Sequence, residues 1–169
     1  MLGSYENFPK SIHRAEIFTS LYSPKKLQQR LIQALYEINS RTFSFDQIAL
    51  PTIPNGTIIF EIGIADSDAF TYVDKEELEQ VLKTLKKENI QTIDLFCAIR
   101  YYKNTNEKRT ALKFDYYLLR VVFKEKTVEF QIFHEKGPRY ISPEGLTTFI
   151  VNNLNGSSYR KLLKSVKTL

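Results

Sequence analysis

Tryptophan is absent from this chain of 169 residues, and cysteine, histidine and glycine are scarce. Because Cys97 is the only cysteine, the sequence excludes a disulfide within the chain and a zinc site built from cysteines. The two histidines, His13 and His134, are too few for a histidine-rich metal site, and we expect no metal. We expect Cys97 to be buried and inert, in a reducing, cytoplasmic compartment.

Long apolar runs are also missing. No stretch approaches the roughly 20 residues that span a bilayer, and the first residues lack the apolar core of a secretion signal, so we expect no membrane partner. The six glycines are scattered and form no phosphate-binding loop, and no serine lies in a nucleophile-elbow motif. These absences argue against an enzyme.

Basic residues are plentiful in the second half of the chain. The 24 Lys and Arg exceed the 19 Asp and Glu, for a formal net charge of +5. Residues 61–89 hold eight acids and four bases, whereas residues 100–126 hold eight bases and three acids. This segregation predicts one positive surface, which is compatible with a nucleic-acid partner.

The spacing of apolar residues predicts an α+β fold. Alternation indicates strands over 12–21, 42–49, 57–65, 92–102, 111–123 and 127–135, and helical spacing indicates helices over 24–39, after Asp74 and after Ser142. Short joints between the later strands predict an antiparallel sheet, a meander of four or more strands, with helices packed on one face. We expect one domain over 1–156 and a short basic amphipathic helix over 157–169.

The strand pattern assigns side chains to the two faces of the sheet. Ile93, Leu95 and Cys97 are expected to face the core, and Phe96, Tyr102 and Phe133 to face away from the helices. In 111–123 the alternation of outward and inward side chains is irregular, because Arg120 is out of phase with Lys113, Asp115 and Tyr117. A bulge near Tyr117 or Leu118 would place both Tyr117 and Arg120 on the face away from the helices.

Aromatic side chains interleaved with cations on one sheet face are typical of single-stranded nucleic-acid binding, because unpaired bases stack on rings while the backbone needs positive charge. We expect Phe96, Tyr102, Tyr117 and Phe133 to stack on bases. The residues expected to meet phosphates are Arg100, Lys103, Lys108, Arg109, Lys113, Arg120, Lys136 and Arg139. The same composition also suits an ordinary solvated sheet, because aromatic residues favour strands.

Two further functions remain open from the residues alone. Exposed aromatics and arginines are enriched at the cores of protein interfaces, so the same face could serve a protein-interaction or assembly subunit. A metal-dependent nuclease is the third possibility, since Asp115 followed by Glu129 and Gln131 echoes the order of acids in such enzymes. Asp94 and Glu135 would then complete a magnesium site on the face away from the helices.

Three sheet segments resemble the ThermoDBP group of archaeal single-stranded DNA-binding proteins and its related branches: 96–103 (FCAIRYYK), 112–117 (LKFDYY) and 133–140 (FHEKGPRY). The resemblance covers about residues 10–154. It implies sequence-independent binding of single-stranded DNA in a cleft with an apolar floor and basic rims, with no catalysis and no cofactor. It also implies homo-oligomers, although residues 157–169 are too few for the leucine zipper of the founding type. As separate expectations, the ligand is DNA before RNA and the location is nucleoid-associated.

Overall fold

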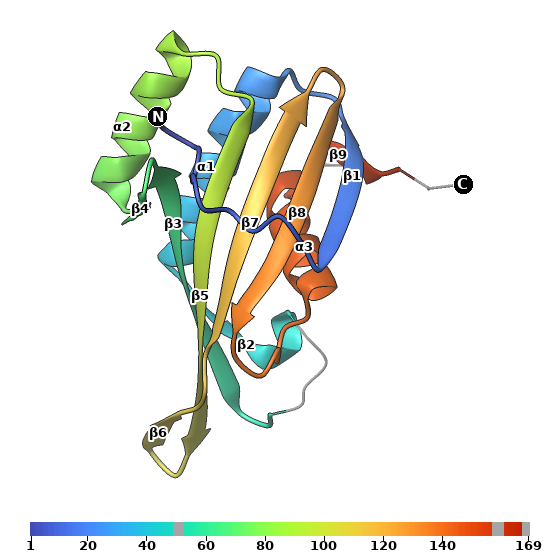
Figure 1. Ribbon diagram of the computed structural model, residues 1–169. Helices are drawn as coiled ribbons and strands as arrows, with labels where there is room; N and C mark the ends of the chain where they lie inside the picture. Colours follow the sequence, from blue (N-terminus) through green and yellow to red (C-terminus); the bar gives the residue numbers. More distant parts are fainter. Residues whose placement is uncertain (49–52, 157–160, 167–169) are drawn as a thin grey trace.

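The computed structural model describes residues 1–48, 53–156 and 161–166, and it forms one large sheet backed by helices (Figure 1). The helices are α1 (Pro24–Asn39), α2 (Lys75–Lys87) and α3 (Pro143–Asn155), with a short 3₁₀ turn, η1 (Phe45–Gln47). The strands are β1 (Arg14–Ser20), β2 (Thr42–Ser44), β3 (Gly56–Asp66), β4 (Ala69–Tyr72), β5 (Thr92–Thr105), β6 (Lys108–Ala111), β7 (Asp115–Lys124), β8 (Thr127–Lys136) and β9 (Leu163–Ser165). The predicted α+β fold with an antiparallel sheet is therefore confirmed.

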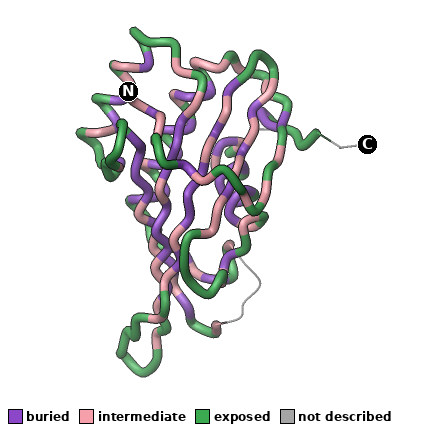
Figure 2. The backbone as a smooth tube through the Cα atoms, viewed as in Figure 1, coloured by how far each residue is buried: buried purple, intermediate pink, exposed green. Residues whose placement is uncertain are grey.

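The strands lie in the order β2-β3-β5-β7-β8-β1-β9, and every pairing between them is antiparallel. Strand β4 pairs with β3, and β6 pairs with β5, so each of these extends one end of the sheet. The β5–β6 hairpin projects beyond the rest of the sheet and is exposed at its tip (Figures 1 and 2). Its turn uses Asn106 and Glu107, both with positive φ, as a tight hairpin requires.

All three helices cover one face of the sheet, and their apolar stripes form the core with the inward side chains of the strands (Figure 1). Each helix begins at a residue whose side-chain oxygen accepts a hydrogen bond from the backbone three residues on: Ser23, Asp74 and Ser142. Phe149 of α3 stacks on Phe60 of β3, with ring centroids 4.8 Å apart, and Phe43 of β2 packs edge-on against both rings. These three helices do not cover the opposite face of the sheet, which we call the outer face.

Residues 1–13, the N-terminal segment, run across the outer face (Figure 1). Gly3 lies between β3 and β5 where these strands separate: its N–H donates to Ala65 O, and its C=O accepts from Asp94 N. A side chain at Gly3 would meet Thr92 O at 2.6 Å, and its φ of +91° favours glycine. The first residues of the chain are therefore hydrogen-bonded into the sheet between β3 and β5.

Several predicted boundaries need correction. The strand expected over 42–49 ends at Ser44 and is followed by η1, while Ala49 lies outside the described residues. Strand β4 was not expected, and β5 extends beyond Tyr102 to Thr105, where it forms a β-hairpin with the short strand β6.

The predicted C-terminal helix is wrong for the residues that the structure describes. Leu163–Ser165 form β9, which pairs with β1, and the side chain of Asn155 holds Leu163 through two hydrogen bonds. Leu162 and Leu163 are buried, so their apolar character reflects docking on the domain rather than a helix stripe. Residues 157–160 and 167–169, with Arg160 and Lys167, lie outside the described residues. No helix in the described part of the chain is long and apolar enough to cross a membrane.

Candidate nucleic-acid interface

The outer face divides into two halves. In the covered half, the N-terminal segment lies on Asp94 of β5, Arg120 of β7 and Phe133 of β8. In the open half, nearer the β5–β6 hairpin, half-buried side chains keep part of their surface in solvent. These are Phe96, Arg100 and Tyr102 of β5, Tyr116 of β7 and Phe114 just before β7.

The covered half is held by an ion pair between the partly exposed Arg120 and the fully buried Asp94. Arg120 donates from Nε and Nη2 to the two oxygens of Asp94, at 2.7 and 2.9 Å, and the backbone N–H of Tyr5 donates to Asp94 Oδ2 at 2.7 Å. The ring of Phe8 covers the guanidinium at 4.3 Å. The hydrogen bonds that Arg120 donates to Asp94 raise the pKa of Arg120, which is the largest effect on that group. Arg120 is therefore engaged within the protein, and its predicted role in phosphate binding loses its basis.

Phe133 is also occupied by the N-terminal segment. It lies on the outer face, as predicted, but the ring of His13 stacks on it with centroids 4.8 Å apart and an interplanar angle of 20°. His13 Nδ1 accepts a hydrogen bond from the backbone N–H of His134, which fixes the imidazole in that position. A base could reach Phe133 only by displacing His13.

The open half contains a continuous row of aromatic rings. Its members are Tyr5, Phe70, Phe96, Tyr116 and Phe114, and successive ring centroids lie 4.8, 5.6, 5.1 and 4.8 Å apart. These distances are typical of packed aromatic pairs. The row crosses β4, β5 and β7, so the sheet fixes its spacing. We call it the aromatic row.

Cations gather at the Phe114 end of the aromatic row. The Arg100 guanidinium lies 5.7 Å from the Phe114 ring centroid, and its Nε donates to Glu61 Oε1 at 2.7 Å. That hydrogen bond is the main cause of the raised pKa of Arg100, so part of this charge is already compensated. On the hairpin, the Arg109 guanidinium lies 3.7 Å above the Tyr102 ring on the outer face. Lys103 and Lys108 are also exposed, but strand alternation and the pairing of Lys108 with Thr105 place them on the other side of the hairpin.

A rigid turn completes this end of the face. The Asp115 carboxylate, fully buried, accepts from Tyr101 Oη at 2.5 Å, His134 Nε2 at 2.9 Å, Arg139 N at 2.7 Å and Tyr140 N at 3.1 Å. Arg139 Nε in turn donates to His134 Nδ1 at 3.1 Å. Both ring nitrogens of His134 are thus used to anchor the turn over 137–141. Arg139 and Lys136 remain exposed on the surface of this turn.

The prediction that Tyr117 lies on the outer face is wrong. Its side chain is fully buried against the helices, and its hydroxyl donates to Ile141 O. The pairing does shift beside Tyr117, where we expected a bulge: Tyr116 pairs with Lys136 and Tyr117 with His134, which makes Glu135 the extra residue. The bulge therefore belongs to β8. Alternation in β7 is unbroken and places Tyr116, Leu118 and Arg120 on the outer face.

Sequence reasoning missed four members of the aromatic row. Tyr116 could have been found by giving Arg120 priority in setting the phase of β7, because residues four apart in a strand share a face. Phe70 lies on the unexpected strand β4, and Tyr5 belongs to a segment with no strand pattern. Phe114 precedes β7 and carried no distinguishing signal.

Buried ionisable groups lie beneath the open half, on the helix side. Burial raises the pKa of Tyr101, Tyr117 and Cys97, and the neighbouring Asp115 raises each of them further. Cys97 is fully buried, as predicted, and its raised thiol pKa opposes thiolate formation. The carboxylates considered for a nuclease site do not meet: Asp94 pairs with Arg120 on the outer face, whereas Asp115 lies among core groups. Within the described residues no three His, Cys, Asp or Glu side chains form a metal-binding group.

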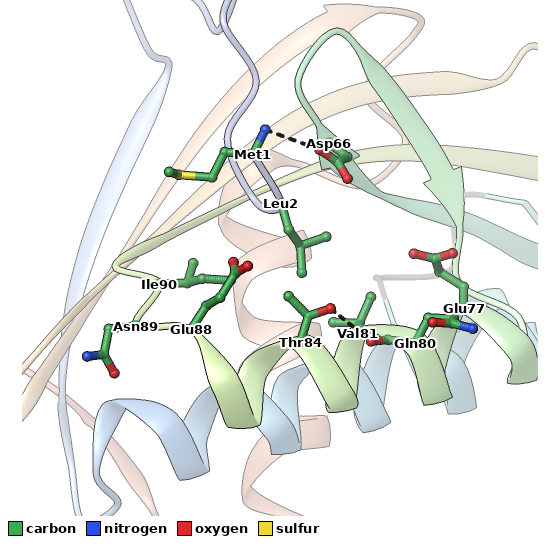
Figure 3. Close-up of a pocket in the computed structure, with 10 residues that line it drawn as sticks. All are labelled: Met1, Leu2, Asp66, Glu77, Gln80, Val81, Thr84, Glu88, Asn89 and Ile90. Carbon is green, nitrogen blue, oxygen red and sulfur yellow. Dashed lines mark hydrogen bonds and ion pairs between the residues drawn. The ribbon is translucent and has the colours of Figure 1, made fainter.

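A separate hollow of about 760 Å³ lies at the other end of the molecule, between the first two residues and α2 (Figure 3). Asp66, Glu77 and Glu88 line it, and the terminal amino group pairs with Asp66 at 3.3 Å. Burial and the negative charges of Asp74 and Asp66 raise the pKa of Glu77. This acidic hollow would repel a phosphate backbone, and it marks the end of the molecule opposite to the hairpin (Figure 1).

Comparisons with known proteins give no relatives: no family model matches the chain, and neither a curated protein nor a solved structure matches it. The resemblance to the ThermoDBP group therefore stays a prediction.

Proposed function

We propose that this protein binds single-stranded nucleic acid, DNA before RNA, without sequence preference and without catalysis. The observation that carries the proposal is the aromatic row, whose basic end meets the cations of the β5–β6 hairpin and the 136–139 turn. Unpaired bases stack on such rings, and the phosphates between them require positive charge alongside. A duplex would hide the base faces that the row is able to contact.

The proposed interface differs from the one expected from sequence alone. Phe96 and Tyr102 remain as stacking residues, and Tyr116 and Phe114 join them. Lys103, Lys108, Arg109, Lys113, Lys136 and Arg139 supply exposed positive charge, and Arg100 contributes despite its hydrogen bond to Glu61. The bound nucleic acid would run along the open half, from the middle of the sheet toward the hairpin, and away from the acidic hollow.

Fluorescence anisotropy with a labelled oligonucleotide of about 20 bases tests the proposal. Affinity should fall with salt, and the log–log slope should be about −0.7 for each phosphate contact, because each contact releases condensed counterions. Duplex of the same sequence should bind more weakly. The absence of single-strand binding at low salt would refute the proposal, and self-association or a protein partner for this face would then become the better explanation.

Two charge-matched variants show which surface binds. Arg109→Gln removes one cation from the outer side of the hairpin, whereas Lys83→Gln removes one from the exposed side of α2, on the other side of the sheet. We expect Arg109→Gln to reduce the magnitude of the salt slope by about 0.7 and Lys83→Gln to leave it unchanged. Equal effects of the two variants would mean that the attraction is a general response to net charge rather than contact with the open half.

A further inference from the structure

A small pocket at the basic end of the aromatic row has the groups that one nucleotide needs. Its volume is about 470 Å³, within the range of roughly 300–1,000 Å³ found for small-molecule sites. It is lined by Lys113, Phe114, Lys136, Gly137 and Pro138. Phe114 and Pro138 contribute apolar side chains to this lining, and Lys113 and Lys136 contribute basic ones.

The two lysines have no counter-ion among the residues that the structure describes. Neither Lys113 nor Lys136 forms an ion pair with any residue in 1–48, 53–156 or 161–166, and both side chains belong to exposed residues. Arg100, by contrast, is bonded to Glu61, and Arg120 to Asp94. An anion that enters this pocket therefore meets positive charge that is not already neutralised.

The walls of the pocket are held rigidly from below. Gly137 packs so closely on the preceding strand that a side chain there would lie 2.3 Å from Phe114 O and 2.7 Å from Asp115 Cα, and its φ is +119°. Two of the four hydrogen bonds to Asp115, from Arg139 N and Tyr140 N, fix the residues that follow. On the other side, Phe114 packs against Tyr116 with centroids 4.8 Å apart. A rigid apolar slot flanked by free cations reduces the ordering cost of binding.

We propose that this pocket is a mononucleotide subsite, which stacks one base against Phe114 while Lys113 and Lys136 bind the attached phosphate. The choice of a nucleotide as ligand rests on the proposed function. The subsite holds one nucleotide of a bound strand at the end of the aromatic row, and it binds a free nucleoside monophosphate by the same contacts. It takes a base and a phosphate together, so thymidine alone and inorganic phosphate alone bind more weakly than thymidine 5′-monophosphate.

The test is a titration of the ¹⁵N-labelled protein with thymidine 5′-monophosphate, thymidine and inorganic phosphate, each to about 10 mM, which detects millimolar dissociation constants. We expect the monophosphate to shift the amide signals of residues 113–116 and 136–139, and to bind at least about 5-fold more tightly than either fragment. Phe114→Leu should weaken the monophosphate about 5-fold or more, the lower end of one base–aromatic stack. Lys136→Gln, at an exposed position, should weaken it without affecting folding, and Lys83→Gln should have no effect.

Failure of this inference is distinguishable from failure of the proposed function. If the oligonucleotide binds with the expected salt slope but the monophosphate shifts no signal near the pocket, or Lys136→Gln and Phe114→Leu leave its affinity unchanged, the subsite is refuted and strand binding stands. Binding of inorganic phosphate as tight as that of the monophosphate would also refute it, because the base would then contribute nothing. If the monophosphate binds but no oligonucleotide does, the pocket stands as a nucleotide site and the proposed function fails.

Discussion

The two halves of the outer face use the same kinds of side chain for different ends. In the covered half, Arg120 is bonded to a buried carboxylate beneath Phe8, and Phe133 is stacked by His13. In the open half, Arg109 lies over Tyr102 at the surface, and Tyr5 of the N-terminal segment joins the end of the aromatic row beside Phe70. The difference shows that an aromatic residue beside a cation indicates binding only where both keep surface that the rest of the chain does not use.

The largest expected loss of stability comes from a substitution in the covered half. Asp94→Ala should lower the free energy of unfolding by roughly 3–5 kcal/mol, because Arg120 would keep its charge in a largely buried position and Tyr5 N would lose its acceptor. Urea unfolding followed by circular dichroism measures the loss. The matched change in the open half is Arg109→Ala, which should stay within about 0.5 kcal/mol because the residue is exposed. Similar losses for both variants would remove the distinction between the halves.

A smaller effect on stability concerns the buried cluster of Tyr101, Tyr117 and Asp115 beneath the open half. Tyr101 and Tyr117 have pKa values raised by burial and by Asp115, so the folded state keeps their protons where the unfolded chain, with a tyrosine pKa near 10, releases them. Their contribution to stability is therefore complete below about pH 10 and is lost as the pH rises further. Each tyrosine should lower the free energy of unfolding by about 1.4 kcal/mol per pH unit above that point.

The variant Tyr101→Phe isolates one of these two groups. It should be less stable at neutral pH, because Asp115 loses a hydrogen-bond donor, yet above about pH 10 its stability should decline less steeply, by about 1.4 kcal/mol per pH unit. Urea titrations at several alkaline pH values measure both quantities. A slope equal to that of the unmodified protein would mean that Tyr101 is not shielded from solvent as the buried cluster requires.

The third prediction compares one ring from each half. Tyr116→Leu should weaken single-strand binding by about 1–3 kcal/mol, since a stacking surface is lost, with little change in the salt slope. Phe133→Leu should leave the affinity nearly unchanged, because His13 already occupies that ring. Anisotropy titrations beside thermal melts separate binding from stability. If Phe133→Leu weakened binding as strongly as Tyr116→Leu, the N-terminal segment would have to leave the sheet when the strand binds.

The fold could be predicted from the sequence because its elements are local. The caps at Ser23, Asp74 and Ser142 and the apolar spacing in 24–39 and 57–65 act over a few residues, and they specify helices and strands before any tertiary contact forms. The same reasoning failed at Leu163–Ser165, in the described part of the expected C-terminal helix, where the apolar pair Leu162 and Leu163 fits a strand docked on the domain as well as a helix.

The candidate site was harder to predict because it depends on contacts between distant segments. The assignment of Phe96 and Tyr102 to the outer face needed only alternation within one strand. Whether a ring on that face is free depends on the N-terminal segment, whose path is set by Gly3, by the hydrogen bond from Tyr5 to Asp94 and by Phe8. The spacing of apolar residues within a segment carries no information about those contacts between distant segments. The error at Tyr117 arose because a bulge on β8 was assigned to its neighbour, β7.

The most direct test of the account is a map of where a single strand touches the protein. An oligonucleotide carrying 5-iododeoxyuridine, crosslinked by ultraviolet light and analysed by mass spectrometry, marks the aromatic residues that bases contact. The account predicts adducts at Phe96, Tyr102, Phe114 and Tyr116. Adducts confined to His13, Phe133 or the α2 side of the molecule, with none in the open half, would contradict it.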